Sequence, residues 1–402
     1  MKFLSLVLFS AGLVATSPAA FAQKAYGPGV SDTEIKIGNA IPYSGPASAY
    51  GIIGEAESAY YNMINAKGGV NGRKINFISY DDAYSPPKTV EQVRKLVEQD
   101  GILAYTGPSC TPCNAAIHKY MNQKKVPHLF LLTGASKWYD PEHFPWTVPL
   151  YPSYEDEGRF AGKYFKQTNP DGKIAILYQN DDAGKDPVKG FKAGLGDDVS
   201  KIVAERSYEI TQPTIDSEIA ALKASGAEKV FIMATPKFGA QALKKIGELN
   251  WKPLIYITKV TSGIKNVLIP AGVENSTGVL SALFMKEPSD PRWADSPDMK
   301  EYFAFMKEWM PNKDPNDTAI VSGYIAAWMT VKVLRECGDN LTRENVLKVA
   351  TNQKDVVHPL VLPGITLSIT PDDYSGYKAH QMMRFNGTTW EPFGPLTRAD
   401  AL

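Results

Sequence analysis

Apolar positions along the chain follow two alternating spacings, and this alternation predicts the secondary structure. The apolar run at residues 35–41 indicates a strand, whereas residues 54–67 place Ala56, Tyr60 and Ile64 on one face of a helix. The same patterns predict further strands at 74–80, 102–106 and 129–132, and helices at 87–99 and 112–124. Strands and helices that alternate with short connections predict a parallel sheet covered on both faces.

The alternation stops at residues 138–154, which are rich in proline and aromatic residues, and then resumes. The second series predicts strands at 174–178, 202–208, 230–234 and 254–257, and helices at 184–195, 215–225 and 238–249. Two α/β lobes therefore follow one another and separate near residue 150.

The rest of the chain has helical patterns but too few strands for a third sheet. Helices are predicted at 299–310, 318–336 and 343–352, and we expect them to pack on the first lobe. Apolar alternation near 365–369 and 383–385 predicts strands that return to the second lobe. The expected fold is α/β, with two doubly wound parallel-sheet lobes joined by a hinge that the chain crosses several times. Residues 33–149 and 284–366 form the first lobe, and residues 150–283 and 367–402 form the second.

The first residues resemble an export signal rather than part of the fold. Lys2 precedes an apolar run that ends near Ala15, and the small-residue pattern up to Ala22 is typical of a cleavage site. We expect residues 1–22 to be a signal peptide removed after Ala22, which would place the mature protein in the periplasm. No later run approaches the roughly 20 apolar residues of a membrane-spanning helix.

Charge and cysteine content narrow the functional classes. The chain has 43 basic and 43 acidic residues, so no overall field favours nucleic acid or a membrane surface. Cys110 and Cys113 have the spacing of a redox motif, but a local disulfide or two ordinary thiols explains them as well. His118 does not complete a usual zinc spacing, and we expect no metal and no cofactor.

Two turns with small hydroxyl residues suggest a site for a small anion. SGPASAYG at residues 44–51 and GPSCT at 107–111 each follow a predicted strand and precede a predicted helix. Backbone N–H groups at helix N-termini bind carboxylates without a dedicated cation. TGAS at 133–136 and Lys259 also follow strands, and ligands of open parallel sheets bind at these strand ends. We expect these segments to line a cleft between the lobes.

Several motifs resemble the leucine/isoleucine/valine-binding protein family, the periplasmic components of ABC importers with the type I two-lobed fold. The motifs are GPASAYG at 45–51, INAKGGVNG at 64–72 and YDD at 80–82. PWT at 145–147, PSY at 152–154, CGDNLTREN at 337–345 and LPGI at 362–365 resemble a branch associated with aromatic and other organic acids. The resemblance implies a monomeric binding protein, not an enzyme, that delivers a small-molecule organic acid to a membrane permease.

The resemblance also assigns ligand-binding positions. Carboxylate donors of the family fall on two segments after strands of the first lobe, and Tyr50 matches a tyrosine at the cleft edge. Amino-acid binders have an acid in lobe two for the ligand ammonium, and Lys259 within YITK at 256–259 stands at that position. Ala183 replaces a tyrosine that normally lines the cleft. The expected ligand-binding residues are Tyr50, Ser109, Cys110, Thr111, Thr133, Ala135, Ser136, Tyr151, Ala183, Thr235 and Lys259.

The replacements at Lys259 and Ala183 predict a ligand without an amino group that is bulkier than leucine, with an aromatic or other organic acid favoured. The alternative within the same fold is a branched-chain amino acid or a short amide. A different class, an exported hydrolase, would use the carboxyl pairs Asp81/Asp82 or Asp181/Asp182. Those pairs follow strands, and capping of turns or helices explains them equally well. A sensory ectodomain of the same fold is a third alternative.

Overall fold

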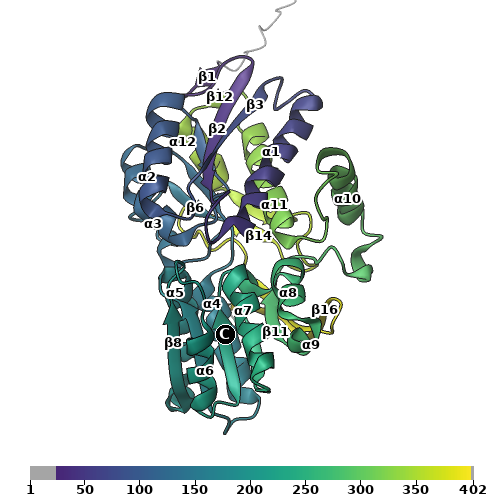
Figure 1. Ribbon diagram of the computed structural model, residues 1–402. Helices are drawn as coiled ribbons and strands as arrows, with labels where there is room; N and C mark the ends of the chain where they lie inside the picture. The colour runs from purple at the N-terminus through teal and green to yellow at the C-terminus, as the bar shows by residue number, and fades with distance from the viewer. Residues whose placement is uncertain (1–23, 400–402) are drawn as a thin grey trace, which may run out of the picture.

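A computed structural model describes residues 24–399 and places them in two lobes (Figure 1). The predicted signal peptide at 1–22 lies outside the described residues. The first lobe contains a five-stranded sheet in the order β3-β2-β4-β5-β6, and all neighbouring strands are parallel. Its strands are β2 (Glu34–Ile41), β3 (Lys74–Asp81), β4 (Ala104–Thr106), β5 (His128–Leu131) and β6 (Thr147–Pro149).

Helices from both ends of the chain cover this sheet. The early ones are α1 (Gly51–Ala66), α2 (Pro86–Lys95) and α3 (Thr111–Gln123), and the late ones are α10 (Pro297–Trp309), α11 (Thr318–Glu336) and α12 (Arg343–Ala350). Helix α11 packs against α1 so closely that a Cβ at Gly323 would collide with the carbonyl oxygen of Ile53. The prediction that the late helices return to the first lobe is therefore confirmed. Nearby, the short strand β1 (Ala25–Tyr26) pairs with β12 (Asn340–Leu341).

The second lobe contains a seven-stranded sheet in the order β16-β15-β11-β10-β9-β7-β8. Its parallel part consists of β7 (Ile174–Gln179), β8 (Ile202–Tyr208), β9 (Lys229–Met233), β10 (Leu254–Ile257) and β11 (Leu280–Leu283). The edge strands β15 (Ala379–Phe385) and β16 (Trp390–Arg398) are antiparallel, because the returning chain forms a hairpin without a crossover helix. Its helices are α4 (Tyr154–Gln167), α5 (Asp182–Leu195), α6 (Asp216–Ala224), α7 (Pro236–Glu248), α8 (Ile269–Ala271) and α9 (Val273–Ser276).

One tail strand differs from the prediction. We expected residues 365–369 to return to the second lobe, but β14 (Leu367–Ile369) pairs with β13 (Gln353–Val356) in a separate two-stranded sheet. Leu367 and Ile369 are fully buried, so their alternation reflects this local pairing rather than a place in the larger sheet. The second predicted segment, 383–385, does join the second lobe as part of β15.

Helix α4 was not predicted, and it packs unusually close to α5. Gly158 of α4 touches the carbonyl of Pro187, and Gly190 of α5 touches the carbonyl of Glu155, so a Cβ at either glycine would collide with backbone. Residues without side chains at the crossing allow the two backbones to meet. The glycines also interrupt the apolar stripe that would have revealed the helix in the sequence.

The chain passes between the two sheets after β6, after β11 and before β15, as far as the described residues show. Figure 1 shows green and yellow segments from the second half of the chain running back into both lobes. No helix among the described residues has the length and apolar character needed to cross a membrane.

Candidate ligand-binding cleft

A cavity that is partly open to solvent lies between the lobes, near the ends of strands of both sheets. Tyr151 follows β6 and Lys259 follows β10, whereas Ile53 lies on α1 and Ser322 on α11. The cavity is lined by Tyr50, Ile53, Tyr84, Ser109, Thr111, Leu132, Tyr151, Tyr154, Ala183, Met233, Thr235, Pro236, Lys259, Val260, Gly263, Asn266, Thr318, Ala319 and Ser322. This is the location expected for ligands of open parallel sheets.

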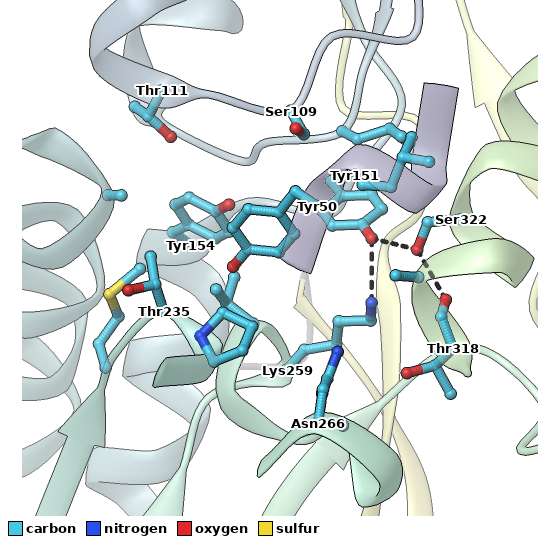
Figure 2. A pocket seen from close by; sticks show the side chains of 18 of the residues that line it. Tyr50, Ser109, Thr111, Tyr151, Tyr154, Thr235, Lys259, Asn266, Thr318 and Ser322 are labelled. Atoms are coloured by element: carbon cyan, nitrogen blue, oxygen red, sulfur yellow. Dashed lines mark hydrogen bonds between the residues drawn. The ribbon is translucent and has the colours of Figure 1, made fainter. Parts of the chain in front are cut away.

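The first lobe presents uncharged hydrogen-bond donors to the cavity (Figure 2). Ser109 lies in the loop between β4 and α3, and its buried Oγ has no partner among the described residues. Thr111 is the first residue of α3, and its hydroxyl contacts that of Thr133 at 2.5 Å. In the first turn of α3, Pro112 has no N–H and that of Cys113 already has an acceptor, so the N–H of Thr111 is the one left for a ligand. This wall can therefore donate several hydrogen bonds to one anion.

Cys110 lies beside these donors but does not line the cavity. It forms a disulfide with Cys113, and its side chain is buried. The structure thus selects the local disulfide among the alternatives that the sequence left open. The bond joins the residue before α3 to the first turn of that helix, which fixes the loop that carries Ser109 and Thr111.

Three predicted residues after β5 lie behind or beside the cavity. Thr133 is buried against Thr111, and Ala135 packs with Trp138. The backbone N–H of Ser136 donates to the Asp186 carboxylate of the second lobe at 2.7 Å. Tyr154 covers this loop, because its backbone N–H donates to the Gly134 carbonyl at 2.8 Å. Leu132 and Tyr154 therefore line the cavity in place of the predicted segment.

Four tyrosines line the cavity: Tyr50, Tyr84, Tyr151 and Tyr154. Figure 2 shows the rings of Tyr50, Tyr151 and Tyr154 next to one another. Burial raises the pKa of the Tyr50 and Tyr84 phenols well above their usual value, so these groups are neutral. Tyr84 also joins the lobes, because its hydroxyl accepts a hydrogen bond from the Gln179 amide at 3.3 Å. Flat phenol rings around a cavity favour a flat or bulky apolar ligand body.

The second lobe contributes the predicted residues Ala183, Thr235 and Lys259. Ala183 lies in the first turn of α5, where its N–H donates to Asp181 at 2.9 Å. Thr235 precedes α7, and its N–H donates to the Tyr208 hydroxyl at 3.0 Å. Both side chains are small, which leaves space on this side of the cavity.

Lys259 is held by two hydrogen bonds, one at its backbone and one at its side chain. Its backbone N–H donates to Glu157 Oε1 at 2.6 Å, and its Nζ donates to the Tyr151 hydroxyl at 2.9 Å. The Tyr151 hydroxyl lies 2.7 Å from Ser322 Oγ, which donates to the Thr318 carbonyl at 3.1 Å. Figure 2 shows this chain of hydrogen bonds. It connects the second lobe, the passage after β6 and helix α11 of the first lobe.

Lys259 is the sole charged residue among those lining the cavity. It forms no ion pair with a carboxylate within the described part of the chain. Burial raises the pKa values of the nearby Glu157 and Glu287 carboxyls to about 8, so both are largely protonated at neutral pH. The Asp317 carboxyl, which caps α11, also interacts electrostatically with Lys259, but it forms no ion pair with the ammonium among the described residues.

Contacts between the lobes flank the cavity. Lys137 pairs with Asp182, and Lys265 pairs with Asp314 at 2.9 Å. Together with the Ser136–Asp186 contact, these pairs show the lobes closed on the cavity.

The carboxyl pairs of the hydrolase alternative lie outside the cavity lining. Asp81 accepts the Ser44 hydroxyl, and Asp82 accepts the Tyr84 N–H at 2.9 Å. Asp181 caps α5, and Asp182 pairs with Lys137. Each carboxylate thus has a structural role. No cluster of residues suited to a metal ion occurs in residues 24–399.

Several lining residues were not predicted. Tyr84, Asn266, Thr318 and Ser322 come from a turn and from two late segments that the sequence placed in no site. Tyr154 belongs to the proline- and aromatic-rich passage, where aromatic residues near a hinge were a usable signal. No local pattern marks Asn266 or Ser322, because the folding of distant segments brings them to the cavity.

Comparisons with known proteins agree with this architecture. A family model described as "Periplasmic binding protein" matches residues 34–385. A curated relative from Pseudomonas aeruginosa, the leucine-, isoleucine-, valine-, threonine- and alanine-binding protein, is 23% identical over 312 residues, 76% of this chain and 79% of the relative. The chain spans about half the length of other curated relatives that it matches.

Two solved structures share the fold. One is a branched-chain amino acid ABC transporter protein from Thermus thermophilus with bound valine, with a TM-score of 0.82, 17% identity and coverage of 92% of this chain and 97% of that one. The other is a solute-binding protein from R. palustris in complex with benzoate, with a TM-score of 0.76, 19% identity and coverage of 92% and 99%. At these identities the likeness concerns the fold alone.

Proposed function

Because the chain belongs to the periplasmic binding protein family, specifically the leucine/isoleucine/valine-binding type, we propose that it is the exported solute-binding protein of an ABC importer. Its ligand is a small carboxylate without an amino group, with an aromatic or similarly bulky organic body. The two similar structures hold valine and benzoate, so the fold by itself does not select between these classes. The residues that line the cavity therefore have to distinguish between an amino acid ligand and an organic acid ligand.

The observation that carries this proposal is the charge of the cavity lining, where Lys259 stands and no carboxylate does, among the described residues. The α-ammonium of an amino acid would lose its hydration on entering and would meet a like charge. An unpaired buried charge costs several kcal/mol, which is comparable to the whole binding energy of a weak ligand. A carboxylate without an ammonium meets attraction instead.

The ligand carboxylate binds at the first lobe. Ser109 Oγ, the Thr111 hydroxyl and the N-terminus of α3 offer donors there, and the unpartnered Ser109 Oγ gains a hydrogen bond on binding. The four tyrosines enclose the ligand body, and the small Ala183 leaves room for a ring.

Closure of the two lobes completes the site. The lobes bring Lys259 to Tyr151 and Ser322 only when they approach each other, because these residues belong to different parts of the two-lobed structure. The carboxylate then exchanges water for oriented donors, and the closed form is presented to a membrane permease.

A ligand panel tests the proposal. Benzoate and 4-methylbenzoate should raise the melting temperature of the purified protein and bind in calorimetry, whereas leucine, isoleucine and valine should not. The opposite result would establish the alternative, a branched-chain amino acid binder, and would contradict the proposal. A Ser44→Ala variant, changed at a turn outside the cavity, should respond like the natural protein.

A further inference from the structure

Lys259 has donors that the protein does not use. A lysine ammonium has three N–H groups, and the Tyr151 hydroxyl accepts one of them. The Tyr151 oxygen is then fully engaged, because it accepts from Lys259 and donates to Ser322. Two N–H groups of Lys259 therefore remain for a group inside the cavity.

Asn266 is a second unused donor on the same side. Its side chain makes no hydrogen bond among the described residues, and its Oδ1 is buried without a partner. That oxygen lies against Gly263, where a Cβ would collide with it. Figure 2 shows Asn266 below Lys259 with its amide nitrogen directed upward, toward the lysine side chain. The amide nitrogen is thus the group that Asn266 offers to the cavity.

These donors come from the second lobe and oppose Ser109 and Thr111 of the first lobe (Figure 2). The cavity consequently has hydrogen-bond donors at two separate places. A ligand with one carboxylate would satisfy one place and leave the other without an acceptor. Enclosing a cation and an amide without a partner is costly when water is excluded.

We infer that Lys259 and Asn266 recognise a second oxygen acceptor of the ligand, so that the preferred ligands are difunctional acids. One end is the carboxylate held by the first lobe, and the other is a second carboxylate or an oxo group held by Lys259 and Asn266. This inference rests on the proposed function and specifies the substrate class of the same site.

The second group is an acceptor rather than an amine or a hydrocarbon. An amine would meet the Lys259 charge, and a methyl group would leave both donors unpaired. Three carboxyls interact electrostatically with Lys259, those of Glu157, Glu287 and Asp317, but none forms an ion pair with its ammonium among the described residues. A second carboxylate on the ligand supplies the direct ion pair that no carboxylate among the described residues makes with Lys259.

Matched probes test the inference by calorimetry on the full mature protein. 4-Formylbenzoate and benzene-1,4-dicarboxylate carry an acceptor where 4-methylbenzoate carries a methyl group of similar size, and the 3-substituted compounds vary the angle. In at least one of these series, the acceptor probes should bind about 10- to 100-fold more tightly than the methyl probe.

The variant Lys259→Met keeps an unbranched, slightly shorter side chain and removes its donors. It should lose that 10- to 100-fold preference, because it should weaken the binding of the acceptor probes much more than the binding of 4-methylbenzoate. Asn266→Leu provides a second variant at a partly exposed position, and it should lose part of the same preference. Circular dichroism and melting temperature establish that each variant is folded.

Two results would overturn the inference. If the acceptor probes bind no more tightly than the methyl probes in either series, Lys259 and Asn266 do not recognise a second acceptor on the ligand. An equal loss for acceptor and methyl probes in both folded variants would show that Lys259 and Asn266 hold the single carboxylate or only support the cavity. Binding of leucine with no binding of any acid would be a separate result, because it removes the proposed function itself.

Discussion

The two walls of the cleft use different chemistry for the same kind of partner. The first lobe offers hydroxyl groups and a helix N-terminus, which are neutral, whereas the second offers the Lys259 ammonium and the Asn266 amide. Neutral dipoles bind a carboxylate with little cost when the cleft is empty and open. A cation that is partly buried requires a partner when the cleft closes. The difference places general carboxylate affinity on one wall and discrimination among ligands on the other.

Reversal of the charge on the second wall should have the largest effect. In Lys259→Glu the cavity gains an acidic side chain, and the affinity for benzoate should fall more than about 100-fold because two negative groups are enclosed together. The same variant should gain measurable binding of leucine or phenylalanine, whose ammonium now has a partner. Calorimetry checks both changes, and unaltered benzoate binding would place Lys259 outside the ligand's reach.

Removal of the hydroxyl groups on the first wall should have the next largest effect. The double variant Ser109→Ala and Thr111→Val should weaken all carboxylates, with or without a second acceptor, by a similar factor of about 10 to 100. A loss restricted to difunctional acids would show that the roles of the two walls are exchanged. Thr89→Ala, which removes a hydroxyl bonded to Asp82 outside the cavity, is the matched control and should leave affinity unchanged.

The Glu157 carboxyl, which accepts the backbone N–H of Lys259, can be tested through the pH dependence of stability. Burial raises the pKa of the Glu157 carboxyl to about 8, above the value near 4.5 in an unfolded chain. Between these values the unfolded chain releases a proton that the folded protein keeps, so the free energy of unfolding falls as pH rises. Its contribution is complete below pH 4.5 and is lost by about pH 8.

The variant Glu157→Gln lacks this proton but keeps an oxygen that can accept the Lys259 N–H. Relative to the natural protein it should gain up to about 1.4 kcal/mol of stability per pH unit between pH 4.5 and 8, and nothing outside that window. Denaturant unfolding at several pH values measures the difference. Parallel curves for the two proteins would contradict it.

The contact between the walls should give the smallest effect. Lys137 and Asp182 join the lobes through side chains that are 39% and 40% exposed. Lys137→Ala should weaken benzoate binding less than about fivefold, and the difference should disappear at about 0.5 M salt. Lys189→Ala is the control, because its pair with Glu155 lies within the second lobe. Equal effects of both substitutions would mean that the Lys137 pair does not support closure.

The sequence predicted the parallel strands well because each is a short apolar run bounded by turn residues. Residues 202–208 and 254–257 have the same limits in the structure as β8 and β10. Helix α4 was missed because Gly158 and Gly162 lie on its buried face and give no apolar signal. The tail was only partly predicted, since an alternating run does not say which sheet it joins.

The site was predicted where a single strand end decides the position. Ser109 and Thr111 come soon after β4 and Lys259 soon after β10, and all three line the cavity. The segment from Thr133 to Ser136 also follows a strand, but Tyr154 covers it, and that contact depends on a helix the sequence did not reveal. Asn266 and Ser322 reach the cavity through tertiary packing, which no local pattern records.

The close glycine contacts between α4 and α5 make these two helices move as one rigid body. One carries Tyr154 and the Glu157 support of Lys259, and the other carries Ala183 and the Asp182 end of the Lys137 pair. Because the two helices move together, the lining residues Tyr154 and Ala183, the Glu157 contact with Lys259 and the Asp182 contact with Lys137 also move together when the cleft closes. A methyl group added at Gly158 or Gly190 would collide with the backbone of the facing helix and push the two helices apart. The shape of the cavity, and with it the ligand preference, would then change although the substituted residue does not touch the ligand.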